Sequence, residues 1–119
     1  MVPLIRDEIY RIAGESLRNA FRHAHARRIE VELCYDRRTF RLRVCDNGRG
    51  IDPKVLAEGG RSQHYGLPGM QERARLVKGK LTVRSGPDSG TEIELTIPSS
   101  VAYVKSRTVR QPLFFGKGA

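Results

Sequence analysis

The sequence predicts an α+β fold, a two-layer α/β sandwich in which helices cover one face of a mixed, mostly antiparallel sheet. Four short segments alternate apolar and polar residues, as strands with one buried face do. Two longer segments repeat apolar residues every three or four positions, as amphipathic helices do. Their order is helix, hairpin, helix, hairpin, and the strands lack the continuous apolar runs of a doubly wound parallel sheet.

The first element is a helix over residues 4–26, the longest periodic segment of the chain. Its recurring apolar residues are Ile9, Ala13, Leu17, Ala20, Phe21 and Ala24. A helix turns by about 100° per residue. On this count Ala13, Leu17, Ala20 and Ala24 share one face, which we expect to point to the core. The opposite, polar face holds Glu8, Arg11, Glu15, Asn19 and Arg22.

This polar face has two interpretations. From the helix alone, a solvated face with ordinary charge pairs between neighbouring turns is the simpler one. The other is ligand binding, because an acid such as Glu15, an amide such as Asn19 and a cation such as Arg22 are the groups that a magnesium-bound phosphate chain requires. His23 lies at the edge of the face, where a surface or capping role is the default for a histidine.

Residues 28–35 and 39–45 are predicted to be two strands of a hairpin, because apolar and polar residues alternate strictly in both. In such a hairpin Cys34 lies opposite a residue near Arg41 rather than opposite Cys45. A disulfide is therefore not expected, and both cysteines are predicted to be reduced thiols, as in cytosolic proteins.

A loop and a second helix follow. Residues 53–66 are rich in glycine and proline and hold few apolar residues, which predicts a mobile loop. Residues 68–78 are predicted to be helical, with Pro68 at the start and Gly79 just past the end.

The second hairpin is predicted from segments 80–85 and 91–98, which alternate again and are joined by the turn sequence GPDSG. Pro98 ends the sheet, because proline cannot donate to a strand ladder. We therefore predict one domain over residues 1–98. Residues 99–119 form a basic tail without clear periodicity, which is expected to be flexible.

Composition limits the classes of partner. The chain has 119 residues, with 22 lysines and arginines against 13 acids and a net charge of +9. A surplus of this size indicates polyanionic partners such as nucleotides, nucleic acid or acidic membranes. Four of these basic residues and no acid lie in residues 99–119, which weakens the case for nucleic acid. The sequence has no apolar run near the ~18 residues of a membrane span, and its start lacks the apolar core of a signal peptide.

Three glycine motifs stand at the ends of the predicted elements. DNGRGID (46–52) follows a strand and leads into a loop, so a hairpin turn does not explain it, and its glycines would let a ligand approach the backbone. HYGLPGMQERA (64–74) sets two glycines at the start of a helix, which favours an anion such as phosphate. SGPDSGTEIEL (85–95) is a turn that delivers a glycine and a threonine to the last strand, and by itself it is ordinary.

Together and in this order, the motifs resemble the ATP-binding domain of sensor histidine kinases, within the superfamily of gyrase, chaperone, histidine-kinase and mismatch-repair ATPases. The family pattern reads E-x-L-x-N-A-x-(K/R)-H-A-x-A, D-(N/D)-G-x-G, G-L-x-G-M-x-E-R and G-T-x-(I/V). These motifs stand here at residues 15–26, 46–50, 66–73 and 90–93. The resemblance spans residues 5–98 and is nearest to the short-lid subfamily that pairs with LuxR-like, helix-turn-helix response regulators. Four spaced motifs are far more specific than one glycine pattern.

The resemblance implies the Bergerat-type ATP-binding fold with ATP and Mg²⁺ as ligands. It implies that Asp46 accepts the adenine amino group, with help from Thr91, and that Asn19 binds Mg²⁺. Glu15 is the implied catalytic residue, which would orient a metal-bound water or the phosphates. The other implied ATP-binding residues are Arg22 and His23 beside the phosphates, Gly48 and Gly50 under the nucleotide, and Gly66, Leu67, Gly69 and Met70 at the lid.

The resemblance also implies partners. The γ-phosphate would pass to a histidine on a separate dimerisation domain of the same kinase, and the signal from there to a response regulator. His23, His25 and His64 lie in or beside ATP-site motifs, so the chain alone is not expected to autophosphorylate. The family's first strand is not evident before Glu8, which would leave a sheet edge open. The implied location is cytoplasmic, with a membrane reached only through parts outside this chain.

Two alternatives stay open. An ATPase or a serine kinase of the same superfamily, acting on a regulatory partner, would use Glu15 as a general base. A nucleic-acid-binding protein would explain the charge of +9 and the paired arginines at 27–28 and 37–38. Aromatic residues are not interleaved with the basic ones, however, so no direct contact with nucleic acid is expected.

Overall fold

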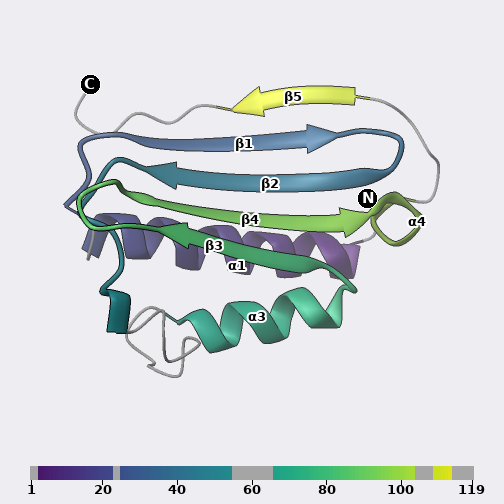
Figure 1. Cartoon of the computed structure of the whole chain (residues 1–119). Helices are drawn as coiled ribbons and strands as arrows, with labels where there is room; N and C mark the ends of the chain where they lie inside the picture. Colours follow the sequence, from purple (N-terminus) through teal and green to yellow (C-terminus); the bar gives the residue numbers. More distant parts are fainter. Residues whose placement is uncertain (1–2, 23–24, 55–65, 104–108, 114–119) are drawn as a thin grey trace.

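The computed structural model describes residues 3–22, 25–54, 66–103 and 109–113 (Figure 1). The predicted loop at 53–66 thus lies mostly outside the described residues. The helices and strands are α1 (Pro3–Arg22), β1 (Ile29–Tyr35), β2 (Thr39–Asp46), α3 (Leu67–Leu76), β3 (Lys80–Ser85), β4 (Thr91–Pro98), α4 (Ser99–Ala102) and β5 (Val109–Leu113). The four predicted strands are confirmed, each with both ends within one residue of the predicted bounds.

The sheet has the strand order β3-β4-β2-β1-β5, and every neighbouring pair is antiparallel. The described sheet is therefore antiparallel throughout rather than mixed. The predicted register of the first hairpin is confirmed, because Cys34 pairs with Arg41. Both cysteines are free thiols, as expected. Figure 1 shows α1 and α3 side by side against one face of this sheet, which confirms the two-layer α+β sandwich.

The region after β4 was predicted to be a flexible tail, but it contains helix α4 and strand β5. Ser99 donates a backbone hydrogen bond to the Arg38 carbonyl oxygen (2.8 Å), and its hydroxyl donates to the Arg37 carbonyl oxygen (2.6 Å). The Tyr103 hydroxyl donates to the Thr39 carbonyl oxygen (3.0 Å). These bonds fasten the segment that contains α4 onto the β1–β2 turn. Farther on, β5 pairs along β1 and occupies the sheet edge that sequence analysis expected to be open.

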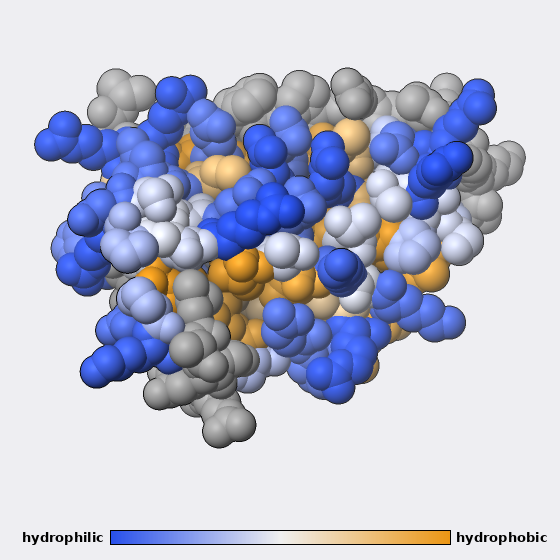
Figure 2. Space-filling model, viewed as in Figure 1, coloured by the Kyte–Doolittle hydropathy of each residue, from blue (hydrophilic) through white to orange (hydrophobic). Residues whose placement is uncertain are grey.

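The hydrophobic core lies between the sheet and the two long helices. Its largest fully buried side chains are Phe40, Ile12, Ile29, Leu42, Met70, Leu95, Ile97 and Val77. Hydrophilic residues cover much of the face seen in Figure 2, and hydrophobic ones show in the band between the sheet and the helices. Within the described part of the chain, no helix is long and apolar enough to cross a membrane.

The face of helix α1 that points to the core differs from the predicted one. Its buried residues are Ile5, Ile9, Ile12, Ser16, Asn19 and Ala20. Leu17 is only partly buried and Phe21 is 56% exposed, although both belong to the apolar repeat. The core face includes two polar residues, Ser16 and Asn19. Ser16 is tolerated there because its hydroxyl donates a hydrogen bond to the Ile12 carbonyl oxygen at 2.8 Å.

The end of α1 is also corrected, from residue 26 to Arg22. His25 has a positive φ of 51°, which is incompatible with a continuing α-helix. Ala26 is buried outside the helix, at 4% exposure. The chain then turns directly into β1, so the C-terminal end of α1 lies close to the end of the sheet where β1 begins and β2 ends.

Candidate functional site

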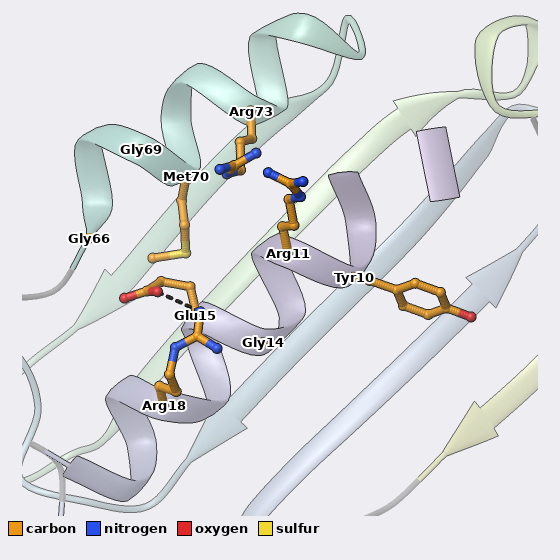
Figure 3. A pocket seen from close by; sticks show the side chains of 9 residues that line it. All are labelled: Tyr10, Arg11, Gly14, Glu15, Arg18, Gly66, Gly69, Met70 and Arg73. Carbon is orange, nitrogen blue, oxygen red and sulfur yellow. Dashed lines mark hydrogen bonds and ion pairs between the residues drawn. The ribbon is translucent and has the colours of Figure 1, made fainter. Parts of the chain in front are cut away.

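Six of the sequence-predicted site residues line two separate hollows in the described structure: Glu15, Gly66, Gly69 and Met70 line the first, and Asp46 and Thr91 line the second. The first, the α1–α3 cleft, has a volume of about 540 Å³ and is lined by Tyr10, Arg11, Gly14, Glu15, Arg18, Gly66, Gly69, Met70 and Arg73 (Figure 3). The second, the sheet-end hollow, has a volume of about 470 Å³ and is lined by Cys45, Asp46, Arg84, Ser85, Gly86, Ser89, Gly90, Thr91 and Glu92.

Asp46 is the last residue of β2 and faces Thr91, the first residue of β4, across the sheet. Its carboxylate accepts a hydrogen bond from the Gly48 backbone N–H at 2.8 Å. Burial raises the pKa of Asp46 above its ordinary value, while hydrogen bonds from the Gly48 and Thr91 backbones partly oppose that rise. A half-buried carboxylate held in this way can accept a further N–H donor, such as the amino group of a purine.

Asn47, the next residue, fixes the start of β1. Its side-chain oxygen accepts hydrogen bonds from the backbone N–H groups of Arg27 (2.9 Å) and Arg28 (2.8 Å). Its own N–H donates to the Arg28 carbonyl oxygen at 3.2 Å. Asn47 therefore ties the segment after α1 to the end of β2, a role that the Asn-Gly step in the sequence does not reveal.

Two glycines fit the end of β2 against the β3–β4 turn. A Cβ atom at Gly50 would overlap the Gly86 carbonyl oxygen, and one at Gly90 would overlap the Asp46 carbonyl oxygen. Both glycines also have a positive φ, of 81° and 80°. Gly50 was expected to make room for a nucleotide. The backbone of the neighbouring turn is itself so close that this position has no space for a side chain.

Ser85 joins the loops around the sheet-end hollow, and sequence analysis gave it no role. Its hydroxyl oxygen accepts a hydrogen bond from the Ile51 backbone N–H at 2.7 Å. The same oxygen lies 2.9 Å from the Thr91 hydroxyl oxygen and 3.1 Å from the Gly90 carbonyl oxygen. Ser85 in β3 therefore connects the start of β4 with the loop after β2, and it fixes the hydroxyl of Thr91, the register partner of Asp46.

In the α1–α3 cleft, Glu15 lies against the N-terminal end of α3. Its carboxylate forms an ion pair with Arg18 at 2.7 Å. A Cβ atom at Gly66 would lie 2.6 Å from Glu15 Oε1, so a side chain there would displace the carboxylate. Gly66 also caps α3 with a φ of 66°, which favours glycine at this position.

Arginines from both helices enter the cleft. Arg73 of α3 pairs with Glu8 of α1 at 3.1 Å and so links the two helices. Figure 3 shows the Arg73 and Arg11 guanidinium groups pointing into the same space. A Cβ atom at Gly69 would meet nothing within 4 Å, so the wall of the cleft is open there. The polar helix face predicted from the sequence included Glu8, Arg11 and Glu15, but neither Arg18 nor Arg73 was given a role.

The remaining predicted residues are placed as follows. Asn19 lies at the edge of the core with 9% exposure, and Arg22 is exposed. Neither residue lines either hollow. Leu67 and Met70 are buried at 4% and 1% and belong to the hydrophobic core, and Met70 also lines the α1–α3 cleft. Met70 Sδ also accepts a hydrogen bond from the Ser16 hydroxyl at 3.6 Å. Gly48 lies in the loop after β2, and His23 is outside the described residues.

Comparison with known proteins gives a family match over most of the chain. Residues 5–101 match the family described as histidine kinase-, DNA gyrase B- and HSP90-like ATPase. The signal transduction histidine-protein kinase/phosphatase DegS of Brevibacillus brevis is 36% identical over 90 residues, which are 76% of this chain and 22% of that protein. The sensor histidine kinase YdfH of Bacillus subtilis is 39% identical over 95 residues, 77% of this chain and 22% of that protein. The chain thus spans about a fifth of the length of these relatives.

Solved structures agree in fold. The histidine kinase domain of the blue-light activated histidine kinase of Erythrobacter litoralis EL346 aligns with a TM-score of 0.68 and 22% identity, covering 82% of this chain and 48% of that chain. The ATP binding domain of PrrB from Mycobacterium tuberculosis aligns with a TM-score of 0.63 and 20% identity, covering 77% of this chain and 67% of that chain. At these identities the likeness establishes the fold alone.

Proposed function

Because the chain belongs to the histidine kinase-, DNA gyrase B- and HSP90-like ATPase family, we propose that it binds Mg·ATP as the catalytic domain of a sensor histidine kinase. In this role it presents the γ-phosphoryl group to a histidine on a separate dimerisation domain of the same kinase. Phosphoryl transfer of this kind depends mainly on positioning and charge neutralisation. A response regulator then receives the signal, and the short-lid subfamily suggests a LuxR-like one. The proposed location is cytoplasmic.

The observation that carries this proposal is the setting of Asp46. Its carboxylate is half-buried beside the Thr91 hydroxyl, and the Ser85 network and two close-fitting glycines hold that end of the sheet in place. A fixed acceptor in a partly dry hollow suits the amino group of adenine. Asp46 is therefore the proposed adenine anchor, with Thr91 as its neighbour.

Magnesium would be held from α1. Asn19 supplies an amide oxygen one helical turn from Glu15, and hard oxygen ligands of this kind are the ones that Mg²⁺ prefers. Mg²⁺ at nucleotide sites takes few protein ligands and is otherwise bound by phosphates and water. The described residues contain no group of three acid, histidine or cysteine side chains that could hold a metal by themselves. Asn19 thus fits a metal that is shared with the nucleotide.

Titration with a fluorescent ATP analogue, with and without Mg²⁺, tests the proposal. Asp46→Asn should weaken binding roughly 10- to 100-fold, because a hydrogen bond to a charged acceptor is lost. Asn19→Ala should remove most of the gain in affinity that Mg²⁺ provides. Asp88→Asn is the matched control, since it makes the same chemical change at an exposed turn residue. Wild-type affinity in the Asp46→Asn and Asn19→Ala variants would show the site assignment to be wrong.

The alternative within the family is an ATPase or serine kinase with Glu15 as general base. The ion pair between Glu15 and Arg18 at 2.7 Å disfavours it, because the carboxylate that would have to accept the proton is already engaged by a guanidinium group. ATP hydrolysis by the isolated chain that is lost in Glu15→Gln would support this alternative.

A further inference from the structure

The α1–α3 cleft contains three arginines to which the proposed function gives no role: Arg11, Arg18 and Arg73. Arg18 is paired with Glu15, and Arg73 is paired with Glu8. Arg11 forms no ion pair or hydrogen bond with any of the described residues and is exposed in the cleft. Three guanidinium groups thus face two carboxylates, which leaves the cleft with a positive excess that suits an anion.

The walls of the cleft favour the same kind of ligand. The first turn of α3 contains no acidic residue, and no side chain caps its N-terminal end. Pro68 has no backbone N–H, and the Met70 N–H donates to the Gly66 carbonyl oxygen at 3.1 Å. The N–H groups of Leu67 and Gly69 are therefore the ones that can attract negative charge at this helix start. Gly69, in that first turn, leaves this approach open, since a Cβ atom there would touch nothing within 4 Å. The arginines and the helix end therefore border the same cleft, which favours an anionic ligand there.

The position of the cleft relative to Asp46 indicates which anion it is. Asn47 holds the segment after α1 beside Asp46, so the C-terminal end of α1 lies near the proposed adenine anchor. Asn19, Glu15 and Arg11 then follow toward the N-terminus at intervals of one turn, about 6 Å each. A triphosphate that passes Asn19 with its metal would continue toward the cleft, with its last phosphate farthest from the base.

We propose that Arg11 and Arg18 bind the γ-phosphate of ATP in the α1–α3 cleft, with Arg73 as a side wall that Glu8 holds in place. This inference rests on the proposed function, because it adds residues to the same nucleotide site. Arginine suits the role, since its planar fork can donate two hydrogen bonds to one phosphate. Arg18 would exchange part of its contact with Glu15 for the more highly charged phosphate. ADP lacks the γ-phosphate and would not use these two residues.

The test compares ATP and ADP binding to the full chain in the presence of Mg²⁺ by isothermal titration calorimetry. Arg11→Ala and Arg18→Ala should each weaken ATP binding about tenfold, the loss expected for a hydrogen bond to a charged group. ADP affinity should stay within about twofold of wild type, as expected where no contact is lost, which would also show that the variants fold. Arg11→Lys should fall between wild type and Arg11→Ala, because lysine keeps the charge but loses the fork.

Arg6→Ala is the matched control. Arg6 is an exposed arginine of the same helix, its ion pair with Asp7 is long at 3.8 Å, and it lies outside the cleft. Its removal should leave both affinities unchanged. An unchanged ratio of ATP to ADP affinity in Arg11→Ala and Arg18→Ala would overturn the inference while leaving the proposed function intact. Failure of the wild-type chain to bind either nucleotide would contradict the proposed function itself, and this assignment with it.

Discussion

The two hollows have similar volumes, about 470 Å³ at the sheet end and about 540 Å³ between α1 and α3, but they are built differently. One wall of the sheet-end hollow carries the Arg84–Glu92 ion pair, at 3.3 Å. Around the rest of it, backbone groups and short side chains touch directly, and glycines occur where two chain segments meet. Around the α1–α3 cleft, long charged side chains meet across a space that is open at Gly69.

This difference in construction matches two different tasks. A hollow bounded by fixed backbone has little freedom to adapt and is suited to a rigid, planar group. A cleft bounded by arginines and glutamates can exchange ion pairs at small cost, because solvent-exposed pairs contribute little to stability. It is suited to a group whose charge distribution changes during transfer. Substitutions of the close-fitting glycines at the sheet end should therefore reduce stability, whereas those in the cleft should mainly reduce binding.

The largest effect is expected from Gly90→Ala. The new methyl group would overlap the Asp46 carbonyl oxygen, and the residue would be held at a φ of 80°. Backbone strain and overpacking together should lower the free energy of unfolding by about 3 kcal/mol or more. Urea denaturation followed by circular dichroism measures the loss. An unchanged denaturation midpoint would show that the sheet end is not rigid.

Gly69→Ala is the paired control for this substitution, in the wall of the cleft. Gly69 is helical, its φ is not positive, and a Cβ atom there meets nothing within 4 Å. Alanine should therefore leave the free energy of unfolding unchanged or raise it by up to about 1 kcal/mol, through its higher helix propensity. A loss as large as that in Gly90→Ala would remove the proposed contrast between the hollows.

The sequence predicted four of the five described strands accurately, but not the contacts between distant loops. Strict alternation fixed the bounds of β3 and β4, and the hairpin geometry placed Cys34 opposite Arg41. No local pattern, however, could show that Gly50 meets Gly86, because that contact depends on how two hairpins join. The glycine motif was therefore identified, while one physical reason for its glycines was missed.

Helix α1 and strand β5 show two other limits of periodicity. The apolar repeat favoured Leu17 as a core residue, but the buried face includes Ser16 and Asn19, whose polar groups have partners. The VRQPL sequence of β5 does not alternate and contains Pro112, which is unfavourable within a sheet. Because β5 is at the edge, next to β1 alone, a proline is tolerated there.

A smaller effect is expected from Asp46→Asn on stability, in contrast to its large effect on binding. Burial raises the pKa of Asp46, so the ionised carboxylate destabilises the folded state above that pKa. The variant should therefore unfold at the same or a higher temperature than wild type at pH 7. The difference in unfolding temperature between the variant and the wild type should shrink as the pH falls toward the ordinary carboxyl pKa of 3.8, because Asp46 of the folded wild type then becomes protonated. Thermal unfolding between pH 7 and pH 4 measures the trend, which a variant less stable at pH 7 would contradict.

The smallest effect concerns the Glu8–Arg73 pair across the cleft. Its side chains are 14% and 36% exposed and 3.1 Å apart, so a double-mutant cycle with Glu8→Gln and Arg73→Ala should give a coupling of about 0.5–1 kcal/mol. The Glu72–Arg75 pair within α3 is the control, since it is longer, at 3.5 Å, and its side chains are 57% and 77% exposed. Its coupling should not exceed about 0.3 kcal/mol. A coupling energy of several kcal/mol between Glu8 and Arg73 would mean that this wall is as rigid as the sheet end. The cleft could then not adapt, contrary to what its charged side chains indicate.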